Sequence, residues 1–136
     1  MSVRRANNDD YEKIIELYTE FTGEEYTIGE NDFFNFIGAH RIYVIESLEG
    51  IVIGCATFFT EKKLIHNLSW VAHIEDVIIS SSYRGQGYGK VLIKHLIAKA
   101  EEEACYKVIL NCSDDVRPFY ETCGFQEKNL QMAVYF

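Results

Sequence analysis

"HIEDVIISSSYRGQGYGK", residues 73–90, joins an apolar run to a helical pattern through three closely spaced glycines. The apolar run before the glycines predicts a buried strand, and the apolar spacing after them predicts a helix. A glycine-rich turn that opens a helix collects main-chain N–H groups at the positive end of the helix dipole, and this arrangement suits phosphate oxygens. The stretch therefore predicts a strand, an anion-binding loop and a helix, in that order.

Two well-known phosphate loops do not fit these glycines. The Walker loop needs a glycine five residues before its Gly–Lys pair and a hydroxyl residue after the lysine, but this chain has Arg84 and Val91 there. The dinucleotide fingerprint needs a third glycine where the chain has Lys90, and it belongs in a leading βαβ unit. The alternative to a phosphate-binding loop is a flexible turn, in which the glycines only permit positive φ angles.

Outward from this stretch, the sequence predicts an α/β fold: a mixed sheet flanked by helices, in a single domain over residues 1–136. The early strands should pair antiparallel, and the helix after the glycines should cross over to a parallel strand. Helices are expected over residues 7–21, with capping residues Asn8 and Asp9, and over 31–38, 88–104 and 115–125. Strands are expected over residues 2–6, 41–47, 51–59, 64–79, 106–112 and 129–136.

Composition narrows the classes of partner. The chain has 13 basic and 21 acidic side chains and a net charge of -8, which argues against a nucleic-acid or anionic-membrane partner. No apolar stretch approaches the roughly 20 residues of a membrane span, and the first residues lack a signal-peptide core. We therefore expect a soluble, cytoplasmic protein.

Four cysteines, Cys55, Cys105, Cys112 and Cys123, show neither C-x-x-C spacing nor histidines at zinc-site intervals. They are interpreted as reduced, mostly buried thiols, and no metal is expected. A redox or metal role is the alternative that this spacing does not favour.

The segment RGQGYG, residues 84–89, fits the pattern Arg/Gln-x-x-Gly-x-Gly/Ala in full and so resembles the pyrophosphate loop of the GNAT family of N-acetyltransferases. Within that family, residues 63–96, 105–112 and 119–125 look most like glucosamine 6-phosphate N-acetyltransferases. The resemblance implies the GNAT fold, acetyl-CoA as co-substrate, and direct acetyl transfer to the amine of glucosamine 6-phosphate in a ternary complex. It implies coenzyme contacts from Val77, Ile78, Arg84, Gly85, Gln86, Gly87, Tyr88, Gly89 and Lys90, with the Val77 N–H as a candidate oxyanion donor.

The same resemblance gives catalytic roles to Glu75, Asp76 and Tyr120. Adjacent residues of a regular strand point to opposite sides unless a bulge separates them. The resemblance implies that the strand is distorted here, so that Glu75 and Asp76 both help to orient the acceptor amine and to remove its proton. The Tyr120 hydroxyl corresponds to the one that the family places near the coenzyme sulfur, where it can act as general acid. The alternatives are two solvated carboxylates at a strand end and a tyrosine that only packs.

For the acceptor, the resemblance points to Lys63 and His66 as cations that meet the sugar phosphate. It also points to a hydroxyl contact from Thr22, or from Thr19, after the first helix. The expected substrate site thus comprises Thr22, Lys63, His66, Glu75, Asp76 and Asn111.

Three positions depart from the family pattern. Asn111 stands where an acidic residue is expected, and Tyr135 stands where a basic residue is expected. Val116 lies near the position at which many relatives carry an asparagine that contacts the coenzyme. An asparagine can neither take a proton nor pair with an ammonium ion. Two other classes therefore stay open: an acetyltransferase of the same fold that acts on a polyamine, an amino acid or a protein N-terminus, and a non-catalytic coenzyme-binding module.

The predicted strand over residues 129–136 is apolar and would leave an exposed edge. We therefore expect a homodimer. In the resembled enzymes, C-terminal segments cross between subunits and help to build the acceptor pocket.

Overall fold

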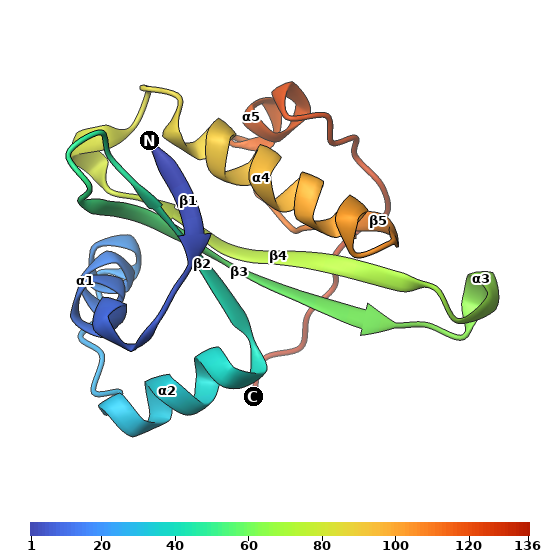
Figure 1. Ribbon diagram of the computed structural model, residues 1–136. Coiled ribbons are helices and arrows are strands. Elements are labelled where there is room, and N and C mark those ends of the chain that lie inside the picture. The colour runs from blue at the N-terminus through green and yellow to red at the C-terminus, as the bar shows by residue number, and fades with distance from the viewer.

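Five strands form one mixed sheet in the order β1-β2-β3-β4-β5 in the computed structural model, which describes residues 1–136 (Figure 1). Strands β1 to β4 pair antiparallel with their neighbours, and β5 pairs parallel with β4. The helix after the glycine loop makes the crossover between β4 and β5, which confirms the predicted mixed sheet. The strands are β1 (Ser2–Arg5), β2 (Arg41–Glu46), β3 (Val52–Lys62), β4 (Trp70–Ile79) and β5 (Cys105–Ile109).

Helices cover both faces of this sheet, and each face has its own core (Figure 1). Helices α1 (Tyr11–Thr22) and α2 (Glu30–Ala39) pack on one face, and α4 (Tyr88–Glu102) packs on the other. The short helix α5 (Arg117–Thr122) lies beside α4, and the 3-10 turns η1 (Asn8–Asp10) and η2 (Ser81–Tyr83) precede α1 and the glycine loop. None of the helices is both long enough and apolar enough to cross a membrane.

The β3–β4 hairpin extends beyond the rest of the sheet and carries α3 (Ile65–Leu68) at its tip (Figure 1). The sequence predicts a strand from residue 64, but His66, Asn67 and Leu68 take φ angles of 52°, 58° and 65° and form a turn. Left-handed backbone does not continue a ladder, so β4 begins only at Trp70.

The last residues form no strand, so the predicted closing strand over 129–136 is wrong for the single chain. The side chains of Leu130 and Met132 are 86% and 91% exposed. Beyond Phe125 the chain makes no main-chain hydrogen bond, and Figure 1 shows it leaving α5 without joining the sheet. An apolar segment becomes a strand only when it finds a neighbouring strand, and this one finds none within its own chain.

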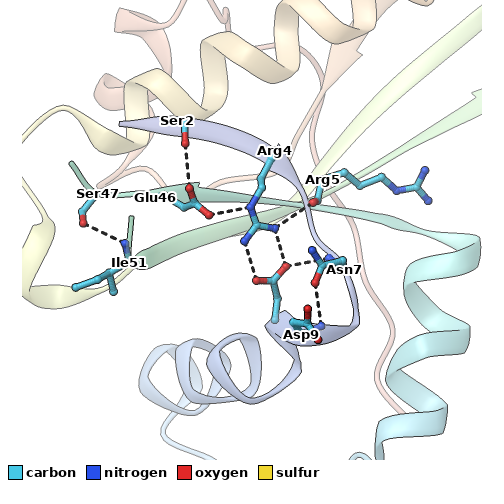
Figure 2. A network of polar contacts seen from close by, with 9 residues as sticks. Ser2, Arg4, Arg5, Asn7, Asp9, Glu46, Ser47 and Ile51 are labelled. Carbon is cyan, nitrogen blue, oxygen red and sulfur yellow. Dashed lines mark hydrogen bonds and ion pairs between the residues drawn. The ribbon is translucent and has the colours of Figure 1, made fainter. Parts of the chain in front are cut away.

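A polar network fixes the start of α1 against the first two strands (Figure 2). The Arg4 guanidinium donates to both carboxylate oxygens of Asp10, at 2.8 and 3.0 Å, and to Glu46 of β2 at 2.8 Å. Asp10 also accepts the Asn7 main-chain N–H, and the Asn7 side chain accepts from the Asp9 N–H, which makes a reciprocal cap. The cap therefore lies one residue before the predicted capping residues.

Replacing Asp10 by asparagine should lower the free energy of unfolding by about 2 kcal/mol at neutral pH, because charged hydrogen bonds to Arg4 are lost. Burial alone would raise the pKa of Asp10, but hydrogen bonds from Arg4 and the Asn7 N–H outweigh it and hold that pKa below its usual value. The stabilisation is therefore present above about pH 4 and is lost as the pH falls through the lowered pKa. Urea unfolding at several pH values should show the two proteins converging in acid.

A difference that stays constant from neutral to acid pH would contradict this assignment. The control is Asp114→Asn, because Asp114 is 92% exposed in its ion pair with Arg117. This variant should change the free energy of unfolding by less than about 0.5 kcal/mol.

Candidate active site

Strand β4 carries a bulge at the acidic pair that the sequence singles out. Between the pairs Thr57–Glu75 and Cys55–Ile78, two residues of β4 lie opposite one residue of β3. Asp76 is one of the two, and its φ of +50° breaks the regular strand conformation. A bulge of this kind bends the strand and redirects its side chains. The distortion that a joint role of the carboxylates requires is therefore present.

The bulge turns both carboxylates toward the α1 side of the sheet. Glu75 lies opposite Thr57, whose hydroxyl is 3.4 Å from the Tyr18 hydroxyl of α1, and directly opposed residues share a face. Asp76 is exposed, and its carboxylate is close enough to the Cys55 thiol, in the core beneath α1 and α2, to act on it: burial and then the Asp76 charge raise the pKa of Cys55 to about 12. The two carboxylates can thus act on one ligand from the same side.

Strands β4 and β5 separate at the bulge and leave a cleft. β5 pairs with β4 only from Trp70 to His73, and the rest of β4 has no parallel partner. The cleft has a volume of about 790 Å³ and is lined by Glu75, Asp76 and Val77 of β4. Main-chain groups that would otherwise pair with β5 are left available to a ligand there. A cleft of this volume suits a small molecule.

The glycine loop forms part of this cleft and presents unpaired donors. The main-chain N–H groups of residues 85–90 donate no hydrogen bond within the protein. Gly85 and Gly87 have φ angles of 75° and 89°, which let successive N–H groups gather on one side of the loop. Helix α4 begins within this loop, and Arg84 and Lys90 line the cleft beside it. The loop therefore offers donors, helix dipole and cations to a diphosphate.

Close packing explains two further glycines. A Cβ on Gly89 would lie 3.1 Å from the Phe119 ring, so this glycine lets α4 lie against α5. Gly54 of β3, which the sequence did not single out, sits where a Cβ would meet the Ile78 carbonyl oxygen at 2.6 Å. Only a glycine lets β3 approach β4 so closely next to the cleft.

Tyr120 of α5 lies in the wall of the cleft. Its ring packs edge-to-face against Phe119 and Phe125, with centroids 5.0 and 6.0 Å away. Burial raises the pKa of Tyr120 to about 12, with smaller contributions from Cys112 and Cys123. The phenol therefore keeps its proton at neutral pH, and it can donate that proton to a ligand in the cleft.

Three of the predicted coenzyme residues direct their side chains elsewhere. Ile78 and Tyr88 are 1% and 7% exposed, and their side chains belong to the two cores. The Gln86 side chain turns back and donates to the Ser82 carbonyl oxygen at 3.2 Å. In this arrangement these residues meet a ligand through their main chain.

The predicted acceptor residues do not all come together in one chain. Asn111, which follows β5, lines the cleft together with the two carboxylates. Thr22, at the end of α1, does not line the cleft, but it lines a second pocket of about 470 Å³ that it shares with Asp76. Lys63 and His66 lie toward the tip of the β3–β4 hairpin. At about 3.3 Å per residue, the part of β4 that separates this tip from Asp76 spans about 20 Å.

Some side chains of the cleft wall were not found by reading the sequence. Those within residues 112–122 lie close in sequence to the predicted Tyr120, and this closeness is the signal that could have pointed to them. Phe21 belongs to α1, and only the tertiary fold brings it to the cleft. The side chains concerned are Phe21, Ile79, Tyr83, Cys112, Ser113, Phe119 and Thr122.

Comparison with known proteins assigns these features to a family. The model of the Acetyltransferase (GNAT) family matches residues 11–125. A glucosamine 6-phosphate N-acetyltransferase of Candida albicans is 36% identical over 124 residues, which cover 91% of this chain and 83% of that protein. The crystal structure of glucosamine-6-phosphate N-acetyltransferase from Arabidopsis thaliana matches with a TM-score of 0.89 at 33% identity, and covers 99% of this chain and 97% of that one. A putative acetyltransferase from Agrobacterium tumefaciens matches with a TM-score of 0.91 at 26% identity, over 100% of both chains.

The matched residues 11–125 contain the bulge of β4, the glycine loop and Tyr120. The resemblance inferred from the sequence is thereby confirmed by the family match, by curated relatives and by the fold. The chain therefore belongs to the GNAT family of acetyltransferases.

Proposed function

We propose that the protein transfers the acetyl group of acetyl-CoA to the amine of glucosamine 6-phosphate, which gives N-acetylglucosamine 6-phosphate and coenzyme A. One observation carries the coenzyme half: unpaired N–H groups over residues 85–90 belong to a cleft that also holds two carboxylates and a protonated phenol. The choice of glucosamine 6-phosphate as the acceptor is supported by the relatives, which are glucosamine 6-phosphate N-acetyltransferases. The cytoplasm remains the predicted location of this reaction.

The coenzyme lies along the cleft in this proposal. Its pyrophosphate accepts hydrogen bonds from the N–H groups of residues 85–90, and Arg84 and Lys90 balance its charge. Its pantetheine arm follows the unpaired part of β4, which brings the thioester to the bulge. There the Val77 N–H is the proposed donor to the oxyanion that develops on the thioester oxygen.

The chemistry follows from the groups around the bulge. The acceptor must lose a proton of its ammonium group before it can attack. In this proposal Glu75 and Asp76, which line the cleft, accept that proton. The amine nitrogen then attacks the carbonyl carbon, the carbon–sulfur bond breaks, and the Tyr120 hydroxyl gives a proton to the leaving sulfur. The nitrogen loses its second proton as the amide forms, and one proton returns to the Tyr120 phenolate, so that the turnover releases one proton in all. Both substrates occupy the site together, so the transfer is direct and needs no acyl-enzyme.

We further propose that two copies of the chain complete the acceptor site. A sugar phosphate needs cations, yet Lys63 and His66 lie far from Asp76 along β4 within one chain. The apolar residues 130–136 are exposed and lie beside no strand. A homodimer in which these segments reach the neighbouring copy covers the apolar surface and brings new side chains to the acceptor.

Light scattering coupled to gel filtration, at about micromolar protein, should give the mass of two chains. Deleting residues 130–136 should give a monomer, because it removes the exposed apolar segment that we expect to bind the partner. The deletion should lower turnover of glucosamine 6-phosphate more than it weakens coenzyme binding. A monomeric full-length protein would contradict the homodimer.

Release of free thiol from acetyl-CoA tests the proposed reaction. Turnover with glucosamine 6-phosphate, and much less with glucosamine, supports it. Turnover only with a polyamine, an amino acid or a peptide N-terminus would move the assignment to a cationic acceptor, which the net charge of -8 would suit. Coenzyme binding without turnover of any amine would identify a non-catalytic module.

A further inference from the structure

Helix α1 is joined to the start of the glycine loop by one carboxylate that the proposed reaction does not use. Glu20, in the last turn of α1, accepts the Ser81 main-chain N–H at 2.6 Å and the Ser80 hydroxyl at 3.3 Å. Ser80 and Ser81 stand between the end of β4 and the glycines. Two parts of the chain that are distant in sequence therefore meet where the chain enters the loop.

The stability of α1 does not explain an acidic residue at this place. The C-terminal end of a helix is the negative end of its dipole, so a glutamate in the last turn is unfavourable for the helix. No basic residue lies in that turn to balance the charge. Hydrogen bonds from Ser81 and Ser80, together with the charge of Arg84, hold the pKa of Glu20 below its usual value, so the carboxylate is ionised at neutral pH. What Glu20 contacts is the entrance of the loop.

Glu20 is one of two side chains that fix the turn before the glycines. The Arg84 Nε donates to the Ile79 carbonyl oxygen at 2.9 Å, which closes the turn and leaves the terminal nitrogens of the guanidinium to a ligand. Across the same turn, Glu20 holds the Ser81 N–H. The N–H groups of residues 85–90 stay unpaired within the protein. The entrance of the loop is thus fixed by the protein itself, and the donors that follow it remain for a ligand.

Charge alone would make this carboxylate a hindrance to an anionic ligand. A carboxylate near a bound diphosphate repels it, by an amount that falls with distance and with screening by salt. The geometry offers a gain of the opposite sign, because a loop whose entrance is already fixed loses less conformational freedom when a ligand binds. The two effects predict opposite changes in affinity when the carboxylate is removed.

We propose that Glu20 is a positioning residue for the coenzyme, and that by holding the Ser81 N–H it keeps the glycine loop in the conformation that takes the pyrophosphate. The proposal rests on the coenzyme site described above and adds to it a residue from a distant helix. Glu20 does not line the cleft and acts through the main chain of the loop. Its loss should therefore weaken coenzyme binding and leave the chemical step unchanged.

Glu20→Ala should raise the Kd for coenzyme A about 10-fold in isothermal titration calorimetry. The KM for acetyl-CoA should rise by a similar factor, while kcat at saturating acetyl-CoA stays within about twofold of the parent value. Glu20→Gln keeps an oxygen that can accept the Ser81 N–H and loses only the charge, so its Kd should stay within about threefold of the parent value. Alanine is a good helix former, and Glu20 is exposed, so both variants should fold.

The matched control is Glu16→Ala. Glu16 lies one turn earlier on α1 and pairs with Lys13 of the same helix at 3.2 Å. Its loss changes the net charge by the same amount without touching the loop. This variant should bind coenzyme A within about twofold of the parent protein, because an exposed ion pair contributes little.

Coenzyme binding by Glu20→Ala that is as tight as in the parent, or tighter, would overturn the proposal, because the repulsion would then be at least as large as the gain from a fixed loop. An equal loss in Glu20→Ala and Glu20→Gln, or in Glu20→Ala and Glu16→Ala, would also overturn it, since the hydrogen bond to Ser81 would not be the cause. Calorimetry needs no acceptor, so these results leave the proposed function standing when the parent protein binds coenzyme A. A parent protein that binds no coenzyme A would remove both proposals.

Discussion

Gly87→Asp should weaken the binding of coenzyme A by at least about 100-fold. The φ of +89° at Gly87 is one that residues with a side chain rarely adopt, so the variant also loses about 1 to 2 kcal/mol of folding stability, apart from its effect on the ligand. The new carboxylate would also stand among the N–H groups of residues 85–90, where it would take their hydrogen bonds. A like charge about 4 Å away costs a bound pyrophosphate up to about 4 kcal/mol near a protein surface, and each 1.4 kcal/mol is about a factor of ten in affinity. Isothermal titration calorimetry with coenzyme A measures the loss.

Gly50→Asp separates the backbone strain from the effect on the ligand. Gly50 lies in the turn between β2 and β3 with a φ of +79°, and a Cβ on either Gly50 or Gly87 would have no neighbour within 4 Å. Both variants should therefore lose a similar amount of stability, while Gly50→Asp should bind coenzyme A as the parent protein does. If the two variants bind coenzyme A equally well, the glycine loop does not hold the pyrophosphate.

The glycine loop, where we propose that the coenzyme binds, could be predicted from the sequence because its signals are local. A strand, a glycine-rich turn and a helix follow one another within residues 73–90, and the unpaired N–H groups result from that order alone. Tyr120 likewise stands in a short motif, and the fold brings that motif to the same cleft. Local sequence sufficed here because few distant contacts take part.

The acceptor side could not be predicted because it depends on contacts between distant elements. The direction of Asp76 depends on how β4 pairs with β3 around Cys55, and strand alternation alone predicts the opposite direction from Glu75. The second pocket exists only where α1 and α2 meet the sheet. The segment over residues 130–136 has the composition of a strand, but its own chain offers it no neighbour. In each case the residue types could be read from the sequence, but the distant residues that they contact could not.

Tyr120→Phe should lower kcat by about 10² to 10⁴-fold, because the leaving sulfur loses its proton donor. The affinity for coenzyme A should stay nearly unchanged, since the phenyl ring keeps the contacts with Phe119 and Phe125. Steady-state kinetics gives kcat, and calorimetry with coenzyme A gives the affinity. A loss of kcat matched by an equal loss of affinity would show that Tyr120 only packs.

The matched control for this variant is Tyr83→Phe. Tyr83 lines the same cleft and packs edge-to-face against Tyr88 at 5.9 Å, so it tests whether any tyrosine hydroxyl in the cleft matters. This control should keep kcat within about twofold. The pH profile adds an independent test: burial raises the pKa of Tyr120 to about 12, and a general acid is lost only as the pH rises through its pKa. The kcat of the parent protein should therefore not fall between about pH 8 and about pH 10 through this group, and a fall in that range that Tyr120→Phe abolishes would mean that the phenol ionises far more easily than its burial implies.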